Sequence, residues 1–343
     1  GRPELADHYE RLAVLLDKLN APQTGVRQLE KLADDIRDPA LKQALGNIVK
    51  RLRKATNPAE RMKIASQSSA EWRRQIERPA ALTPLNRVRL LLASLAMEQE
   101  AYAVGNQLVD YNPDVSRARR LQWLGFLSNA LYGSGLLSER QRLAIEQHVV
   151  TLTSGQTLST TAYYNGLRYL ARVPQWAQRA KEFHFARTVE SWSALTPMAY
   201  AYVPDRLRGG PLLAYTRLLD TLARDGNALI GIRHQLFGQQ VETGLRALNP
   251  GLRRGVLTSS PADGAYRRDG IYLLPATTPE LPPIAGILTL GEGNALSHVQ
   301  LLARNLGIPN VVVDEKHRAL LTSAVGRKVV LAVSPRGAVQ ISE

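Results

Sequence analysis

Apolar side chains in the first 250 residues recur at helical spacing. Because residues three and four apart share one face of a helix, such spacing predicts amphipathic helices whose apolar face packs into a core. The clearest stripes are Leu12, Leu15, Leu16 and Leu19; Leu85, Val88, Leu91, Leu92 and Leu95; and Ile145, Val149 and Leu152. The predicted helices span residues 4–20, 26–37, 39–54, 58–77, 82–102, 139–152, 161–173, 176–192 and 212–240.

The pattern changes near residues 248–254, a segment that contains Asn249-Pro250-Gly251 and predicts a turn or linker. Short β-rich runs follow at 255–259, 270–274, 286–290, 310–313, 328–333 and 338–342, with helices predicted at 296–306 and 315–321. We therefore expect a multidomain protein of the α plus α/β class. An all-α region of unknown role would span residues 1–250, and a small β/α domain would span residues 251–343.

Composition places the chain among ordinary globular proteins. Of its 343 residues, 44% are hydrophobic and 22% are charged, and none is cysteine. A disulfide framework and a thiolate metal site are thereby excluded, which fits a cytoplasmic location. Apolar runs stay well short of the roughly 18 residues that a membrane helix needs, so we expect no membrane partner.

The net charge of +14 lies mainly in the predicted helical region. Residues 251–343 carry 10 basic and 7 acidic side chains, which leaves 34 basic and 23 acidic side chains for residues 1–250. A basic surface attracts polyanions, but it also simply keeps a protein in solution. The basic clusters at 50–54 and 117–120 fit exposed helix faces as well as a phosphate-rich partner. We expect no nucleic-acid partner.

Candidate chemistry lies in residues 286–313, which read as strand, glycine-containing loop, helix, stop and strand. Gly291 and Gly293 allow close backbone approach, and His298 falls in the first turn of the predicted helix. Gly307 suits a left-handed cap, and Pro309 prevents the helix from continuing. A helix N-terminus offers unpaired N–H groups to a phosphate and disfavours a charged imidazole. A neutral imidazole there can act as a nucleophile toward phosphorus.

A simpler interpretation is that His298 is a polar surface residue in an ordinary helix. The Gly-x-Gly loop lacks the third glycine of a dinucleotide-binding loop, and no Gly-Lys-Ser/Thr follows it. The five remaining histidines show no metal-ligand spacing, so we predict no metal site. Aromatic residues at 163, 164, 169, 176, 192, 200 and 202 could line an acceptor pocket, but we favour packing in the helical core.

Residues 286–313 resemble the swivelling phosphohistidine domain of the PEP synthase and pyruvate phosphate dikinase family. That family reads Gly-Gly-x-Thr-x-His, then Ala-Arg-Glu-x-Gly-Ile-Pro-Ala-Val-Val. Here Ala303-Arg304, Gly307-Ile308-Pro309 and Val311-Val312 stand at matching distances from His298. The upstream run 277–282 resembles the family's Thr-x-Pro-Glu stretch. Leu296-Ser297-His298-Val299 is closer to the glucan and phosphoglucan water dikinases of the same superfamily.

The resemblance covers roughly residues 255–343 and implies a phosphoryl shuttle. It implies that His298 accepts a phosphoryl group that originates from ATP and passes it to pyruvate, a glucan or another acceptor. The residues that would bind or support the phosphate are Gly291, Gly293, Asn294, Ser297 and Arg304. Arg304 fits a surface salt bridge equally well. The sequence departs from the family at Asn294, where a second glycine is usual, and at Leu296, where threonine is usual.

The donor site is missing from the predicted elements. An ATP-grasp domain needs a large mixed sheet, and residues 1–250 show almost no strand pattern. We therefore expect no cofactor on this chain, and ATP with Mg²⁺ on an ATP-grasp partner in a longer chain or a separate subunit. The alternative is a catalytically silent binding or scaffold module, whose basic helical region docks a polyanion or a partner protein.

Overall fold

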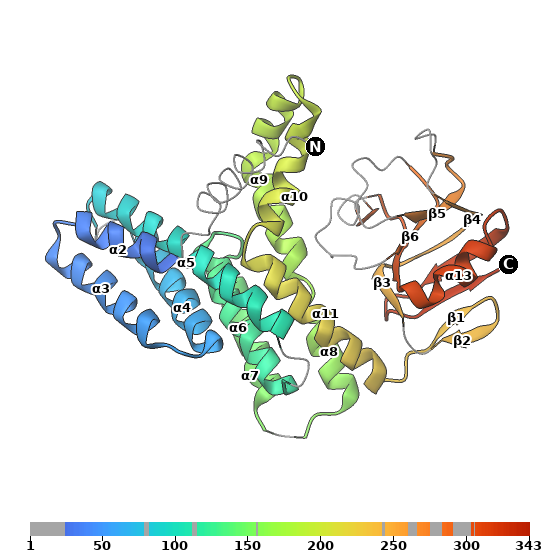
Figure 1. Cartoon of the computed structure of the whole chain (residues 1–343), viewed down its shortest axis with the longest axis horizontal. Coiled ribbons are helices and arrows are strands. Elements are labelled where there is room, and N and C mark those ends of the chain that lie inside the picture. Colours follow the sequence, from blue (N-terminus) through green and yellow to red (C-terminus); the bar gives the residue numbers. More distant parts are fainter. Residues whose placement is uncertain are drawn as a thin grey trace, which may run out of the picture.

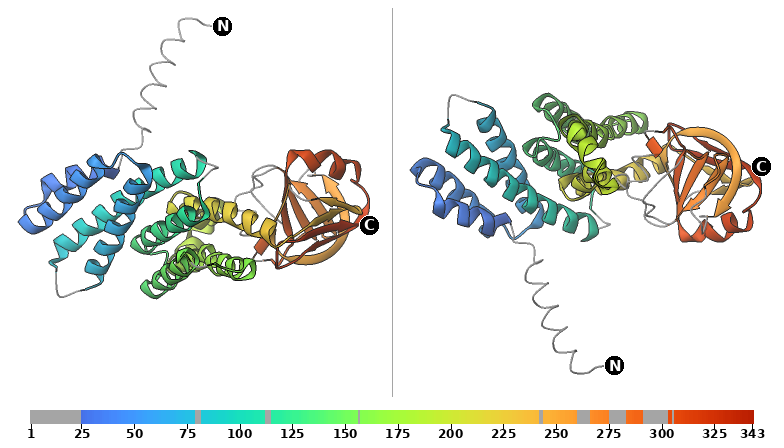
Figure 2. Two further views of the ribbon diagram at one scale, coloured as in Figure 1. Left: turned by 90° about the horizontal axis from the view of Figure 1, so that it is seen from below. Right: turned by 90° about the horizontal axis from the view of Figure 1, so that it is seen from above.

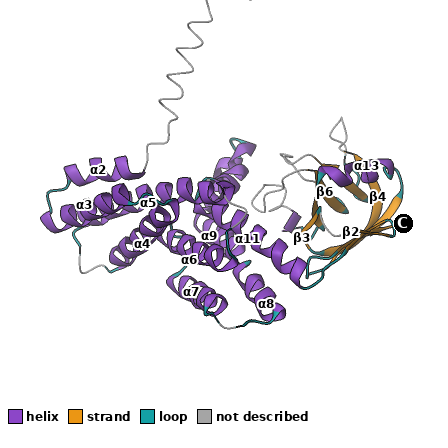
Figure 3. Cartoon of the chain, turned by 60° about the horizontal axis from the view of Figure 1, so that its bottom comes forward, coloured by secondary structure: helices purple, strands orange, loops and turns teal. Residues whose placement is uncertain are grey.

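A computed structural model of the chain separates helices from strands (Figure 1). It describes residues 25–78, 82–111, 115–155, 157–241, 244–259, 266–274, 283–290, 303–304 and 306–343. One group of helices occupies residues 25–229, the strands begin at His234, and a further helix, Glu315–Ser323, lies among the strands. Figure 3 shows the helices of residues 25–229 on one side of the molecule and the strands, with the helix Glu315–Ser323 among them, on the other. The protein therefore belongs to the mixed α plus α/β class that the sequence predicts.

In the helical region, eight of the predicted helices are present, most with shifted ends, whereas the helices at residues 117–133 and 197–208 were not predicted, and the predicted helix 4–20 lies outside the described residues. Its helices are α2 (Gly25–Asp35), α3 (Pro39–Lys54), α4 (Pro58–Glu77), α5 (Pro84–Tyr111), α6 (Arg117–Gly133), α7 (Glu139–Thr153), α8 (Thr160–Leu170), α9 (Val173–Ser193), η3 (Pro197–Ala201), α10 (Tyr202–Arg208) and α11 (Pro211–Leu229). Side-chain caps begin several of them. Asp38 and Asn57 each accept a backbone N–H bond directly before a helix that opens with proline. Local sequence therefore fixes these helix starts.

Two apolar clusters hold the helices together. The first joins α6, α7, α8 and α11 and includes the predicted core residues Ile145 and Val149. Tyr215 of α11 is fully buried in it, and its hydroxyl donates to the Leu170 carbonyl at 3.1 Å. The second cluster joins α2, α3, α4 and α5. An ion pair between the partly buried Arg61 of α4 and the buried Glu100 of α5 adds a polar link between neighbouring helices.

The predicted core stripe of α5 is wrong. Its members lie on the surface, with exposed fractions between 44% and 58%: Leu85, Val88, Leu91, Leu92 and Leu95. The buried face of α5 carries Leu90 and Met97 together with the small side chains of Ala93, Ser94 and Ala96. Small residues let α4 and α2 approach the helix closely, so packing selected this face over the more apolar one. An apolar stripe therefore remains exposed along α5.

A mixed sheet of nine strands forms the second region. The strands are β1 (His234–Leu236), β2 (Gln239–Val241), β3 (Leu245–Asn249), β4 (Gly251–Ser259), β5 (Gly270–Leu274), β6 (Gly286–Leu290), β7 (Asn310–Val313), β8 (Lys328–Val333) and β9 (Val339–Ser342). Their order is β2-β1-β9-β8-β4-β5-β6-β7-β3. The four strands β4, β5, β6 and β7 are parallel, and β3 and β8 flank them in antiparallel pairs. Four of the predicted β runs are confirmed at both ends.

Both faces of the parallel strands are buried. Along β5, Ile271 and Leu273 enter one apolar cluster, whereas Tyr272 and Leu274 enter another on the opposite face. Helix α13 (Glu315–Ser323) covers the first face. Double burial explains why these strands read as continuous apolar runs instead of alternating ones.

The junction between helices and strands differs from the prediction. The predicted helix 212–240 ends at Leu229, and strands β1 and β2 occupy its last part. The predicted turn or linker at 248–254 instead forms the end of β3 and the start of β4, which are paired with β7 and β8. Strand pairing with sequence-distant partners overrides the turn preference of Asn249-Pro250-Gly251.

Among the residues that the structure describes, few polar contacts join the two regions. The Tyr164 hydroxyl of α8 donates to the Arg336 carbonyl at 2.9 Å, and Asp220 of α11 pairs with Arg246 of β3. The chain crosses between the regions at residues 230–233, where Gly231 has a φ of 68°. Figure 2 shows α11 running to the edge of the sheet. In the part of the chain that the structure describes, every helix is too short or too polar to cross a bilayer.

Candidate functional site

The candidate motif is framed by two adjacent parallel strands. Strands β6 and β7 have the bounds that the sequence predicts, and they pair in parallel from Ile287 opposite Asn310 to Leu290 opposite Val313. A parallel pair requires a crossover connection, here residues 291–309. The predicted order of strand, connection, glycine stop and strand is therefore confirmed at both flanks of the motif.

The parallel strands share one carboxyl edge. Strands β4, β5 and β6 end at Ser259, Leu274 and Leu290, and each is followed by residues outside the described part of the chain. The predicted site residues Gly291, Gly293, Asn294, Ser297 and His298 lie outside it as well. Their connection nevertheless starts at the carboxyl end of β6, the edge at which open α/β sheets bind ligands. Asp314, which follows β7 and pairs with His317 at 2.7 Å, marks the same edge in the described residues.

The end of the connection has the predicted stop. Gly307 adopts a φ of 63°, a left-handed conformation that costs glycine little. The Ile308 N–H donates to the Ala303 carbonyl at 2.8 Å, and the Gly307 N–H donates to the Arg304 carbonyl at 3.3 Å. These bonds satisfy carbonyls that would otherwise lack partners at a helix end. Pro309 then leads directly into β7.

Asn249 holds this end of the connection against the sheet. Its side-chain Nδ2 donates to the Ala303 carbonyl at 3.2 Å and to the Ile308 carbonyl at 2.6 Å, and the residue is buried. Sequence analysis missed this role because Asn-Pro-Gly is a strong turn signal. The side chain acts as a clamp between β3 and the connection, which lie more than 50 residues apart in sequence.

Arg304 is the predicted site residue that the structure does describe. It is half-buried, and withdrawal from water lowers the pKa of its guanidinium. Within the described ranges it has no acidic partner and donates no side-chain hydrogen bond. The predicted surface salt bridge is therefore not formed among these residues. A desolvated cation favours an anionic group nearby, because burial of an unpaired charge costs free energy.

Two further polar side chains are buried on the sheet face that this connection covers. Thr289 of β6 and Asn310 of β7 lie with Oγ1 and Oδ1 3.5 Å apart, and Asn310 is fully buried. Among the described residues the Asn310 Nδ2 has no hydrogen-bond partner. Buried donors are nearly always satisfied, so the Asn310 Nδ2 is available to donate to an acceptor on this face of the sheet. Sequence analysis missed it because Asn310 sits inside an apolar strand.

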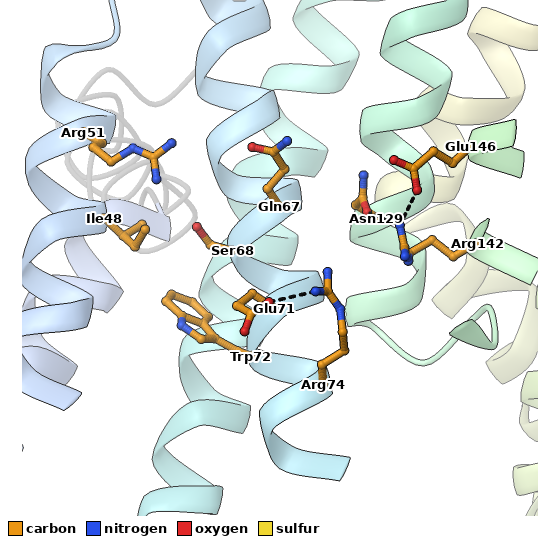
Figure 4. A pocket seen from close by; sticks show the side chains of 10 residues that line it. All are labelled: Ile48, Arg51, Gln67, Ser68, Glu71, Trp72, Arg74, Asn129, Arg142 and Glu146. Atoms are coloured by element: carbon orange, nitrogen blue, oxygen red, sulfur yellow. Dashed lines mark hydrogen bonds and ion pairs between the residues drawn. The ribbon is translucent and has the colours of Figure 1, made fainter. Parts of the chain in front are cut away.

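The helical region contains a polar hollow of about 460 Å³ between α3, α4, α6 and α7. Figure 4 shows that ion pairs already occupy much of its lining: Glu71 binds Arg74, and Glu146 binds Arg142. Arg142 is buried and also binds Glu139 and Asn129, so its charge is fully compensated. Arg51, in the predicted basic cluster, faces the hollow without an ion-pair partner among the described residues.

The remaining candidate residues are dispersed. Tyr163 is buried, as predicted, but Trp192 and Tyr200 are about 60% exposed and so do not pack in the core. Arg117, from the second basic cluster, forms a bidentate ion pair with Asp225, in which its Nε and Nη2 donate to the two carboxylate oxygens at 2.5 and 2.7 Å. His, Asp and Glu side chains form no cluster of three that could hold a metal within the described ranges.

Comparison with known proteins identifies no relative of this chain. No protein-family model matches the chain, and neither a curated protein nor a solved structure matches it.

Proposed function

We propose that this protein is a phosphotransferase component in which His298 carries a phosphoryl group. The observation that supports this most directly is the placement of the motif: its connection leaves the carboxyl end of β6 and returns through a glycine stop into parallel β7. Residues 291–298 thereby follow the strand end where a phosphate would meet backbone N–H groups. On this proposal the sheet region is a swivelling phosphohistidine domain.

The proposed step is a displacement at phosphorus. A neutral ring nitrogen of His298 donates its electron pair to form the N–P bond, and the bond from phosphorus to the donor oxygen breaks with its electrons leaving on that oxygen. Gly291, Gly293, Asn294 and Ser297 would bind the phosphoryl oxygens through N–H and side-chain donors. Arg304 would compensate their charge from the end of the connection, since it lacks an anionic partner among the described residues.

The donor in this proposal is ATP with Mg²⁺, bound by an ATP-grasp domain. Residues 25–229 are helical wherever the structure describes regular elements, so they do not supply the mixed sheet that such a domain needs. The acceptor would be pyruvate, a glucan or another hydroxyl- or enolate-bearing molecule. Delivery to it reverses the bond changes: the acceptor oxygen attacks phosphorus and the N–P bond returns its electrons to the imidazole.

The test is phosphate incorporation in the full chain. The protein, isolated from its native cells at neutral to alkaline pH, should carry one acid-labile phosphoryl group on His298 by mass spectrometry. The variant His298→Gln should lose it, while His184→Gln, which alters an exposed histidine of α9, should retain it. Equal labelling of His298→Gln and the parent chain would contradict the proposal.

The second candidate function is that of a binding or scaffold module without catalytic activity, and one observation favours it. Arg51 faces the hollow between α3 and α4 with no ion-pair partner among the described residues. An anionic group could therefore bind there without displacing an existing ion pair. This function would leave His298 unphosphorylated under the conditions above, so the same experiment separates the two candidates.

A further inference from the structure

The polar hollow between α3, α4, α6 and α7 has the size of a small-molecule site. Its volume of about 460 Å³ falls within the range of about 300–1,000 Å³ that ligand pockets occupy. Its lining crosses α4, from Arg51 of α3 on one side to Asn129 of α6 and Glu146 of α7 on the other (Figure 4). Among the described lining residues only Ile48 and Trp72 are largely apolar, so the hollow suits an elongated polar ligand.

A buried network of ion pairs holds the α6 and α7 side of the hollow in place. The side chain of Arg142 is 8% exposed, and its Nε and Nη2 donate to the Glu139 carboxylate at 3.1 and 2.8 Å. Its Nη1 donates to Asn129 Oδ1 at 3.2 Å and to Glu146 Oε2 at 2.9 Å. Every nitrogen of this guanidinium is therefore bonded. Oε1 of Glu146 accepts no hydrogen bond among the described residues, so it can accept one from a ligand hydroxyl.

The α3 and α4 side carries donors without protein partners. Within the described ranges the Arg51 guanidinium has no ion pair and donates no hydrogen bond, and the side chains of Gln67 and Ser68 form no hydrogen bond either. Figure 4 shows Arg51 reaching from α3 toward the helix that carries the other two. Ser68 is 6% exposed. Buried hydroxyls are nearly always hydrogen-bonded, so ligand or solvent in the hollow must supply its partner.

The charge that remains unpaired in the hollow is positive. Three arginines and two glutamates line it. Glu71 pairs with Arg74 at 2.8 Å, and Glu146 pairs with Arg142 at 2.9 Å, which leaves the charge of Arg51. A guanidinium binds phosphate oxygens through two parallel hydrogen bonds, and this geometry makes arginine a specific partner for phosphate groups. The α3 and α4 side therefore favours an anion with several oxygens.

We propose that this hollow binds a phosphorylated sugar or polyol. The phosphate group, which has three terminal oxygens, lies between Arg51, Gln67 and Ser68, each of which supplies a donor. The hydroxyl groups extend across α4 toward Glu146, whose Oε1 accepts from one of them. This binding site goes beyond the phosphoryl transfer proposed for His298, because the ligand is bound without reacting and the helical region alone supplies the contacts.

Calorimetric titration of the full chain gives a direct test. Glucose 6-phosphate is the probe, and glucose and inorganic phosphate are titrated separately because each carries one part of the recognised chemistry. The probe should bind saturably and about tenfold or more tightly than either part, since each part lacks the charged or the hydroxyl contacts of the other. Binding no tighter than that of inorganic phosphate, or no saturable binding at millimolar probe, would overturn the proposal. The His298→Gln chain should bind the probe like the parent chain, so the two proposals fail separately.

Two matched pairs of variants locate the site. Arg51→Ala should weaken probe binding about tenfold or more, whereas Arg53→Ala, which removes an equal charge that pairs with Glu30 outside the hollow, should leave it unchanged. Gln67→Trp should abolish binding by filling the hollow, while Gln43→Trp places the same side chain elsewhere on α3 and should retain it. All four positions are exposed, so the variants should fold. Equal losses within either pair would reject the site.

Discussion

Asn249, Asn310 and Arg304 show how single polar side chains organise the connection between β6 and β7. Asn249 binds two carbonyls at the end of the connection, Asn310 lies buried on the sheet face beneath that end, and Arg304, which belongs to the connection, is withdrawn from water. Each group is costly to bury alone, so each constrains what can lie next to it. The clamp by Asn249 is the one that has both partners in the described residues.

The substitution Asn249→Ala should lower the free energy of unfolding by about 2 kcal/mol, because it removes two buried hydrogen bonds, to the Ala303 and Ile308 carbonyls. Chemical denaturation measures this loss. The control Gln340→Ala removes an exposed amide from β9 and should change stability by less than about 0.5 kcal/mol. Equal effects of the two substitutions would show that Asn249 is not a clamp.

At the scale of elements, turn chemistry and helix periodicity act locally. Gly307 ends the connection in a left-handed conformation, whereas Gly46 lies inside α3 in open space with ordinary helical geometry. The two glycines therefore have opposite roles. One is needed for its backbone freedom, and the other merely weakens its helix.

Replacement of each glycine by alanine should accordingly change stability in opposite directions. Gly307→Ala should cost about 1 kcal/mol, because a Cβ strains the left-handed conformation. Gly46→Ala should add about 1 kcal/mol through its higher helix propensity, since no atom lies within 4 Å of the new Cβ. Thermal or chemical unfolding of the two variants provides the comparison. A gain in stability for Gly307→Ala would mean that the left-handed cap is not required.

At the scale of the whole molecule, the helices and the sheet are joined by one short crossing. Residues 230–233 connect α11 to β1, and within the described ranges only a few polar contacts, such as Tyr164 to Arg336, bridge the regions elsewhere. All nine strands lie after this crossing. A carrier domain that swivels would need its hinge there, rather than at the predicted linker near residue 250.

Limited trypsin digestion should therefore cut after Arg233 before it cuts after Arg253 or Arg254. Arg233 lies in an exposed connection, whereas the latter two belong to β4 and are held in register with β8. Mass spectrometry of the early fragments identifies the site, and the fragment from His234 should retain the sheet's circular dichroism. Earlier cleavage at Arg253 or Arg254 would place the flexible point inside the sheet instead.

Sequence alone determined the elements whose signals are local. The caps at Asp38 and Asn57 and the glycine stop at Gly307 each depend on a few neighbouring residues, and so do the bounds of β6 and β7. Backbone hydrogen bonding and side-chain sterics within one turn or strand are sufficient to set such features. The predicted strand–connection–strand order of the candidate site follows from them.

Tertiary structure decided which surfaces meet. Helical periodicity predicts that the leucines of α5 share one face of the helix, but it does not predict whether that face is buried. In the structure the opposite face of α5 is buried instead. Strand β3 joined the far edge of the sheet because β7 offered it hydrogen-bond partners, despite its turn-like sequence. The clamp by Asn249 exists only because that pairing brings residues more than 50 positions apart into contact. Non-local contacts of this kind leave no periodic signal in a single sequence, because each depends on the packing of the whole chain.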